Sequence, residues 1–125
     1  MANSARLILV LFSLCLAAGG TTHWMDIARG GFLPYGDMPF PINVFWTSLA
    51  LLDFIALALL WKRRNLGLLL TMAIMVADVA VNSYAAYGLG IAFLSFAPLQ
   101  VQTWFLGFVL GAIVFVWQRD IGRPT

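Results

Sequence analysis

Charged residues are scarce in this chain: they make up only 10% of its 125 residues, whereas 62% are hydrophobic. A soluble protein of this length carries about 25% charged residues, because water must solvate the large surface of a small domain. The composition therefore excludes an ordinary soluble domain. It predicts an integral membrane protein whose main partner is the lipid bilayer.

Cysteine and histidine are also rare, with one residue of each. The single cysteine, Cys15, excludes an intramolecular disulfide and a cluster of metal-bound thiolates. One histidine, His23, is too few for a haem ligand pair or a metal site, even with Asp26 three residues further on. Because phosphate-binding glycine loops and nucleophile elbows are missing as well, we expect no metal and no other cofactor.

The seven basic residues give a formal net charge of +2, but their positions do not suit a nucleic acid. Six of them flank the ends of apolar runs: Arg6, Lys62, Arg63, Arg64, Arg119 and Arg123. Basic residues at such positions are typical of anchors that orient membrane spans. We therefore expect no nucleic-acid partner.

Four segments are apolar and long enough to cross a bilayer, for which a helix needs roughly 20 residues. They are residues 7–24, 43–61, 66–87 and 99–117, although Gly19 and Gly20 weaken the outer end of the first. We predict an all-α fold, a bundle of four transmembrane helices that forms one membrane domain over residues 1–125. The short turn after residue 61 makes the second and third helices an antiparallel hairpin.

The basic residues also predict the orientation of the bundle. They place both termini and the second turn in the cytoplasm, with only Arg29 on the outer side of an inner (plasma) membrane. Residues 25–42 are rich in glycine, proline and aromatic side chains, so they cannot form a long helix or strand. We expect this segment to fold over the outer end of the bundle as a capping loop.

Two aspartates, Asp53 and Asp78, interrupt the second and third spans. An acidic side chain at membrane depth is costly and marks a functional site by default. At 1.5 Å per residue they lie about 12 Å and about 19 Å from the shared turn, so they are not directly opposite each other.

Spacings of three and four residues give each of these helices one polar face. The faces carry Asn43, Trp46, Thr47 and Asp53 on the second span, and Asp78 and Asn82 on the third. If the two faces meet, we expect a ladder in which Asn43 pairs with Asn82 and Thr47 pairs with Asp78. Asp53 would then be the deepest group.

We expect no basic side chain of the spans to neutralise Asp53 or Asp78, so each must be protonated or bind a cation or cationic ligand. Three interpretations follow: hydrogen bonding between the helices, a functional site, or contact with a partner subunit. Further out, His23 and Asp26 share a helix face. They predict either an interfacial hydrogen-bonded pair or a relay that carries protons toward Asp78.

Of these readings we favour a functional site, an outward-opening acidic cavity that binds a proton, a cation or an amphiphilic ligand such as an amine or a lipid. Such a protein would resemble a transporter or receptor. The aspartates would bear the charge, Asn82, Asn43 and Thr47 would orient the ligand, and Trp46 would form a wall. Four helices are few for a transport path, so transport would favour a homo-oligomer. Gly107 and Gly111 form a small-residue motif that permits close approach of helices, as in a homo-oligomer.

Two alternatives stay open. The order of His23 and Asp26, then Leu33-Pro34, then an acid in the second span resembles the sterol-isomerase and sigma-2-receptor superfamily over about residues 15–60. This resemblance implies a membrane enzyme whose paired aspartates, with Asp26 or Asp53 as acid and base, act on a lipid. The other alternative is an accessory or immunity-type membrane protein that acts on a partner through its outer loop.

Overall fold

The computed structural model describes residues 2–92 and 97–121 of the chain. Its elements are α1 (Ala2–Gly30), α2 (Phe40–Lys62), α3 (Arg64–Ser83), the π-helical turn η1 (Tyr84–Gly88) and α4 (Ala97–Ile121). Four candidate spans lie along α1, α2, α3 with η1, and α4, each long and apolar enough to cross a membrane. The predicted all-α fold with four helices of membrane length is confirmed.

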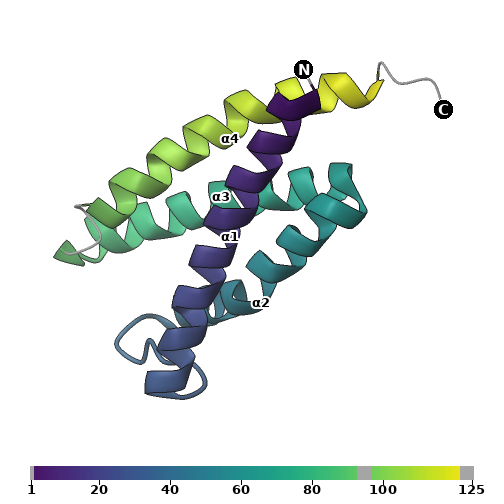
Figure 1. Cartoon of the computed structure of the whole chain (residues 1–125). Coiled ribbons are helices and arrows are strands. Elements are labelled where there is room, and N and C mark those ends of the chain that lie inside the picture. Colours follow the sequence, from purple (N-terminus) through teal and green to yellow (C-terminus); the bar gives the residue numbers. More distant parts are fainter. Residues whose placement is uncertain (1, 93–96, 122–125) are drawn as a thin grey trace.

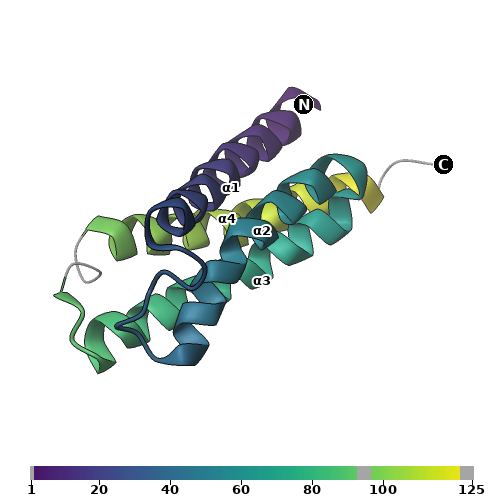
Figure 2. The ribbon, with the colours of Figure 1, turned by 90° about the horizontal axis from the view of Figure 1, so that it is seen from below.

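The helices follow one another around the bundle, with α1 packed on α2, α2 on α3, and α3 on α4. Figures 1 and 2 show α2 and α3 as an antiparallel hairpin, with α4 running back along α3. The start of α1, the α2–α3 turn and the end of α4 lie at one end of the bundle. The loop between α1 and α2 lies at the opposite end, which we call the loop end.

The irregular segment between α1 and α2 is residues 31–39, shorter than the expected loop over residues 25–42. Helix α1 continues to Gly30 and is followed by Gly31, whose φ of 79° is the left-handed conformation that commonly ends a helix. Pro39 precedes α2 and a second proline occupies its first turn, where the missing N–H has no helical partner to lose.

A single residue, Arg63, separates α2 from α3. Gly67 in the first turn of α3 makes this tight hairpin possible, because a Cβ there would lie 2.6 Å from the carbonyl carbon of Leu59. The backbones of the two helices therefore touch beside the turn, in the antiparallel arrangement that the short connection predicts.

Aromatic and aliphatic side chains fill the centre of the bundle. Phe12 of α1 is fully buried and packs edge-to-face on Phe105 and Phe108 of α4, at centroid distances of 5.9 and 5.7 Å. Large apolar side chains also face outward on every helix, among them Leu14, Leu51, Val76 and Trp104. Water would solvate such a surface poorly, so it suits contact with a lipid bilayer.

Candidate functional site

Asp53 on α2 is buried, with only 5% of its surface exposed. Its carboxyl oxygens make no hydrogen bond to the described residues, and they keep some accessible surface, because no fully buried side-chain oxygen in the described part of the chain lacks a partner. It faces a cavity of about 330 Å³. On its α1 side, Gly19 makes room for the carboxyl group, since a Cβ at that position would lie 2.8 Å from Asp53 Oδ2.

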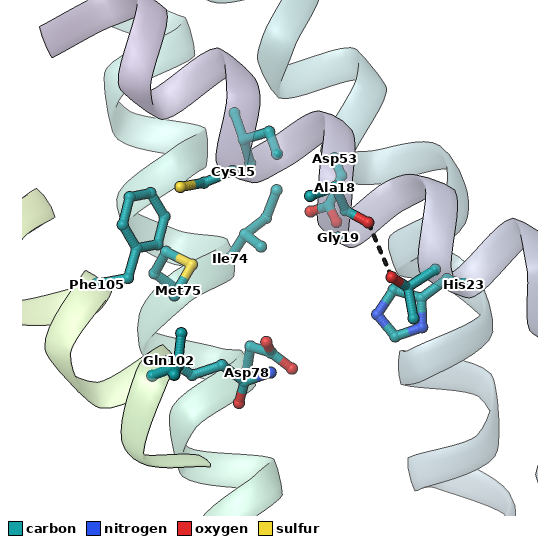
Figure 3. A pocket seen from close by; sticks show the side chains of 13 residues that line it. Cys15, Ala18, Gly19, His23, Asp53, Ile74, Met75, Asp78, Gln102 and Phe105 are labelled. Atoms are coloured by element: carbon teal, nitrogen blue, oxygen red, sulfur yellow. Dashed lines mark hydrogen bonds between the residues drawn. The ribbon is translucent and has the colours of Figure 1, made fainter. Parts of the chain in front are cut away.

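The cavity is bounded by α1, α3 and α4, and Asp53 reaches it from α2 (Figure 3). Most of its wall is apolar, formed by side chains that include Leu16, Ile74, Met75, Val101 and Phe105. The polar side chains in the wall that matter for its chemistry are Asp53, Asp78, His23 and Gln102. Both aspartates predicted to share a site therefore line the same cavity.

Asp78 on α3 is also buried, but it is held by a neighbour. Asn82 Nδ2 donates hydrogen bonds to Asp78 Oδ1 over 3.1 Å and to Gln102 Oε1 over 2.6 Å. The indole N–H of Trp46 donates to Asn82 Oδ1 over 2.7 Å. The amide of Asn82 thus links α2, α3 and α4 and fixes the position of one carboxyl group, whereas no described residue bonds to the carboxyl group of Asp53.

The other polar residues of the α2 face do not line the cavity: Asn43 bonds to the loop over residues 31–39, and Thr47 bonds to Asn43. Asn43 Nδ2 donates to the carbonyl oxygen of Leu33 over 3.1 Å, and Asn43 Oδ1 accepts bonds of 3.3 Å from the backbone N–H of Tyr35 and from Thr47 Oγ1. The expected ladder of Asn43 with Asn82 and Thr47 with Asp78 is not formed. Trp46 makes the bond to Asn82 because its indole is long enough to reach α3 from α2.

At the loop end, Tyr35 joins the two residues predicted to pair directly. Its phenol O–H donates to Asp26 Oδ2 over 2.7 Å, and its oxygen lies 2.9 Å from His23 Nδ1. Since the single phenol proton is given to Asp26, the contact with His23 is one in which Nδ1–H donates to the phenol. Burial, followed by the hydrogen bond to Asp26, raises the pKa of Tyr35 above its usual value of 10.0.

His23 adds a basic side chain to the lining of the cavity. The imidazole lines the same cavity as Asp53 and Asp78, because α1 stays helical beyond it, to Gly30. We expected no basic side chain of the spans to neutralise the aspartates; His23 reaches their cavity, but the described residues show no hydrogen bond or ion pair between it and either aspartate. Gln102 was not predicted as a site residue, although a polar residue inside the apolar fourth span indicates a functional position.

In chemical terms the cavity offers one unpartnered carboxyl group, one held by an amide, and one imidazole, all within apolar walls. Such a cavity suits a molecule that combines a positive charge with an apolar body. Comparisons of the chain with models of protein families, with curated proteins and with solved structures find no match.

Proposed function

We propose that the protein binds an amphiphilic cation, an amine with an apolar body, in the cavity between α1, α3 and α4. The observation that carries this proposal is Asp53, which is 5% exposed, has no partner among the described residues and faces the cavity. A carboxylate that faces an apolar cavity without a hydrogen-bond donor from the described residues is poorly stabilised, and a bound cation would offset that cost. Asp53 is therefore the counter-charge for the ligand.

The composition of the cavity favours an organic cation over an inorganic one. Hard metal ions take six or more oxygen ligands, and transition metals take clusters of histidine, cysteine or carboxylate. Within the described residues, no group of three or more such side chains is placed to hold a metal ion. The volume of about 330 Å³ and the apolar wall suit a small amphiphile.

The other polar residues act around Asp53 in this proposal. Asp78 adds a second carboxyl group to the cavity, and Asn82 keeps it in place through Trp46. Asn43 and Thr47 position the outer loop, so their effect on the ligand is indirect. His23 sits where the cavity meets the loop end and connects it to Tyr35 and Asp26 as an outer relay.

We also propose that both termini are cytoplasmic and that the protein lies in the inner (plasma) membrane. The support is the distribution of charge along the bundle. Arg6 near the start of α1 and Lys62, Arg63 and Arg64 at the α2–α3 turn share one end (Figure 1). Clusters of basic residues favour the cytoplasmic side, so the loop over residues 31–39 faces outward.

The test is calorimetric titration of the protein, in micelles of a detergent without charge, with decylamine as the cationic amphiphile and decanol as its uncharged control. We expect decylamine to bind, decanol to bind weakly, and Asp53→Asn to weaken decylamine binding at least about tenfold, or ~1.4 kcal/mol. Asp37→Asn in the outer loop removes the same charge from an exposed residue and should leave affinity unchanged. Equal affinity of Asp53→Asn and wild type would contradict the proposal.

A second candidate function, acid–base catalysis on a lipid, is favoured by one observation: two carboxyl groups and an imidazole face one cavity. The two functions differ in what the aspartates do. Catalysis predicts that Asp53→Asn and Asp78→Asn still bind a sterol or another neutral lipid but no longer isomerise it. Amine binding predicts no conversion of a neutral lipid by the wild-type protein.

A further inference from the structure

We propose that the amine bound by this protein also carries a hydrogen-bond acceptor, recognised by the side-chain amide of Gln102 on α4. The inference rests on the proposed function, because it describes the second contact of the same ligand. A chain of hydrogen bonds runs from the indole of Trp46 through Asn82 to Gln102 in the cavity wall.

The indole N–H of Trp46 is a donor only, so the atom of Asn82 that lies 2.7 Å from it must be the acceptor oxygen. This contact settles which way the Asn82 amide points. Its NH₂ group must face the other way, toward Asp78 Oδ1 and Gln102 Oε1.

The orientation of Asn82 in turn fixes that of the Gln102 amide. Because the NH₂ group of Asn82 donates to Gln102, the atom of Gln102 that receives this bond must be its carbonyl oxygen. The NH₂ group of Gln102 is then the end of the amide left for other partners. Gln102 lines the cavity, and no described residue bonds its amide nitrogen.

The cavity therefore presents two complementary groups on different helices. Asp53 comes from α2 as a negatively charged hydrogen-bond acceptor and Gln102 comes from α4 as a donor, and no described residue bonds to the carboxyl group or to the amide nitrogen. A plain alkylamine would satisfy the first and leave the second without a partner, which costs free energy in an apolar cavity. An amine with an ether, carbonyl or hydroxyl oxygen in its chain would satisfy both.

The experiment is a scan of decylamine analogues in which one methylene at a time is replaced by an ether oxygen. We expect the wild-type protein to bind one analogue about fivefold more tightly than decylamine, the effect of one neutral hydrogen bond. In Gln102→Leu the ratio of the affinities for the ether and for decylamine should fall to about one, whatever the change in the affinity for decylamine itself.

A second variant tests the orientation of the amides. Trp46→Phe removes one of the two groups that fix Asn82 and leaves the bond to Asp78, so the amides of Asn82 and Gln102 turn over more often and Gln102 presents its NH₂ group to the ligand less often. The preference for the ether should fall although Gln102 is still present. A purely structural role of Trp46 would instead weaken both ligands equally and leave the preference unchanged.

The outcomes separate this inference from the function on which it rests. Suppose that Asp53→Asn still weakens decylamine binding. The inference alone is then overturned if the wild type favours no ether position, or if the preference for the ether persists in Gln102→Leu. If Asp53→Asn binds decylamine as well as the wild type does, the proposed function fails and the role of Gln102 fails with it.

Discussion

Gly19 of α1 lies directly against the carboxyl group of Asp53 on α2 (Figure 3): a Cβ at Gly19 would be 2.8 Å from Asp53 Oδ2. The next residue, Gly20, meets the ring of Phe54 in the same way, with Cε2 2.7 Å from where its Cβ would be. These two glycines allow α1 to pack closely on α2 at the level of the buried carboxyl group. The α1–α2 contact and the candidate site are therefore parts of one arrangement.

Gly19→Ala should weaken ligand binding more than it weakens the fold. The added methyl group meets the end of a side chain, so the carboxyl group of Asp53 can rotate away at small cost. That rotation takes the counter-charge away from its position in the cavity. We expect decylamine to bind about tenfold more weakly, or ~1.4 kcal/mol, in the same calorimetric titration. The apparent melting temperature should stay within a few degrees of the wild-type value.

Gly107→Ala on α4 is the matched control, because a Cβ at Gly107 would have no atom within 4 Å. It makes the same chemical change in another apolar helix and should leave decylamine binding unchanged. If both variants bind decylamine as the wild type does, Gly19 does not position Asp53.

Gly67→Ala should destabilise the protein as a whole. Its Cβ would lie 2.6 Å from the carbonyl carbon of Leu59, and backbone atoms cannot move aside as a side chain can. We expect the free energy of unfolding to fall by ~3 kcal/mol or more, measured by denaturation in sodium dodecyl sulfate. Gly111→Ala, whose Cβ would have no atom within 4 Å, should have no comparable effect.

Tyr35→Phe should loosen the outer loop. The phenol gives its proton to Asp26 and accepts from His23, so the substitution removes both bonds and leaves Asp26 without this donor. We expect a loss of ~1–2 kcal/mol in the free energy of unfolding. Proteolysis within residues 31–39 should also become faster. Tyr87→Phe is the control, because Tyr87 is 67% exposed and its substitution should change neither measurement.

The stability of the wild-type protein should fall at high pH because of the same residue. Folding raises the pKa of Tyr35 above its usual 10.0. The contribution of the phenol to the free energy of unfolding is therefore fully present below pH 10.0. Above that pH the phenol ionises more readily in the unfolded chain, and the native state loses stability. Unfolding measured from pH 8 to pH 11 should show a steeper loss in wild type than in Tyr35→Phe. Parallel curves would show that the phenol does not contribute.

The four helices could be predicted because each depends mainly on local composition. A run of apolar residues must be helical in a bilayer to satisfy its own backbone, whatever its neighbours are. Burial of Asp53 and Asp78 followed from the spacing of polar residues, and both are buried. A helix through Gly19 and Gly20 was harder to predict, because glycine weakens an isolated helix. In the folded protein the two glycines permit close packing of α1 on α2.

The partners of the polar residues could not be predicted. They depend on how each helix is rotated and on the reach of each side chain. The polar residues of α2 bond in two directions: Trp46 bonds to Asn82 on α3, whereas Asn43 bonds to Leu33 in the loop over residues 31–39. Tyr35 is nine residues from Asp26 along the chain, and its position depends on a loop in which Leu33 has a φ of 57°. No local pattern in the sequence indicates such a loop conformation.

The proposed membrane orientation can be tested with single cysteines. In a Cys15→Ala background, Gly36→Cys places a thiol at an exposed position of the outer loop, and Asn65→Cys places one beside Arg63 and Arg64 at the α2–α3 turn. With both termini in the cytoplasm, an impermeant maleimide should label Gly36→Cys in intact cells. It should label Asn65→Cys only after the membrane is made permeable. The reverse pattern would put the basic turn outside and contradict the orientation that its three positive charges favour.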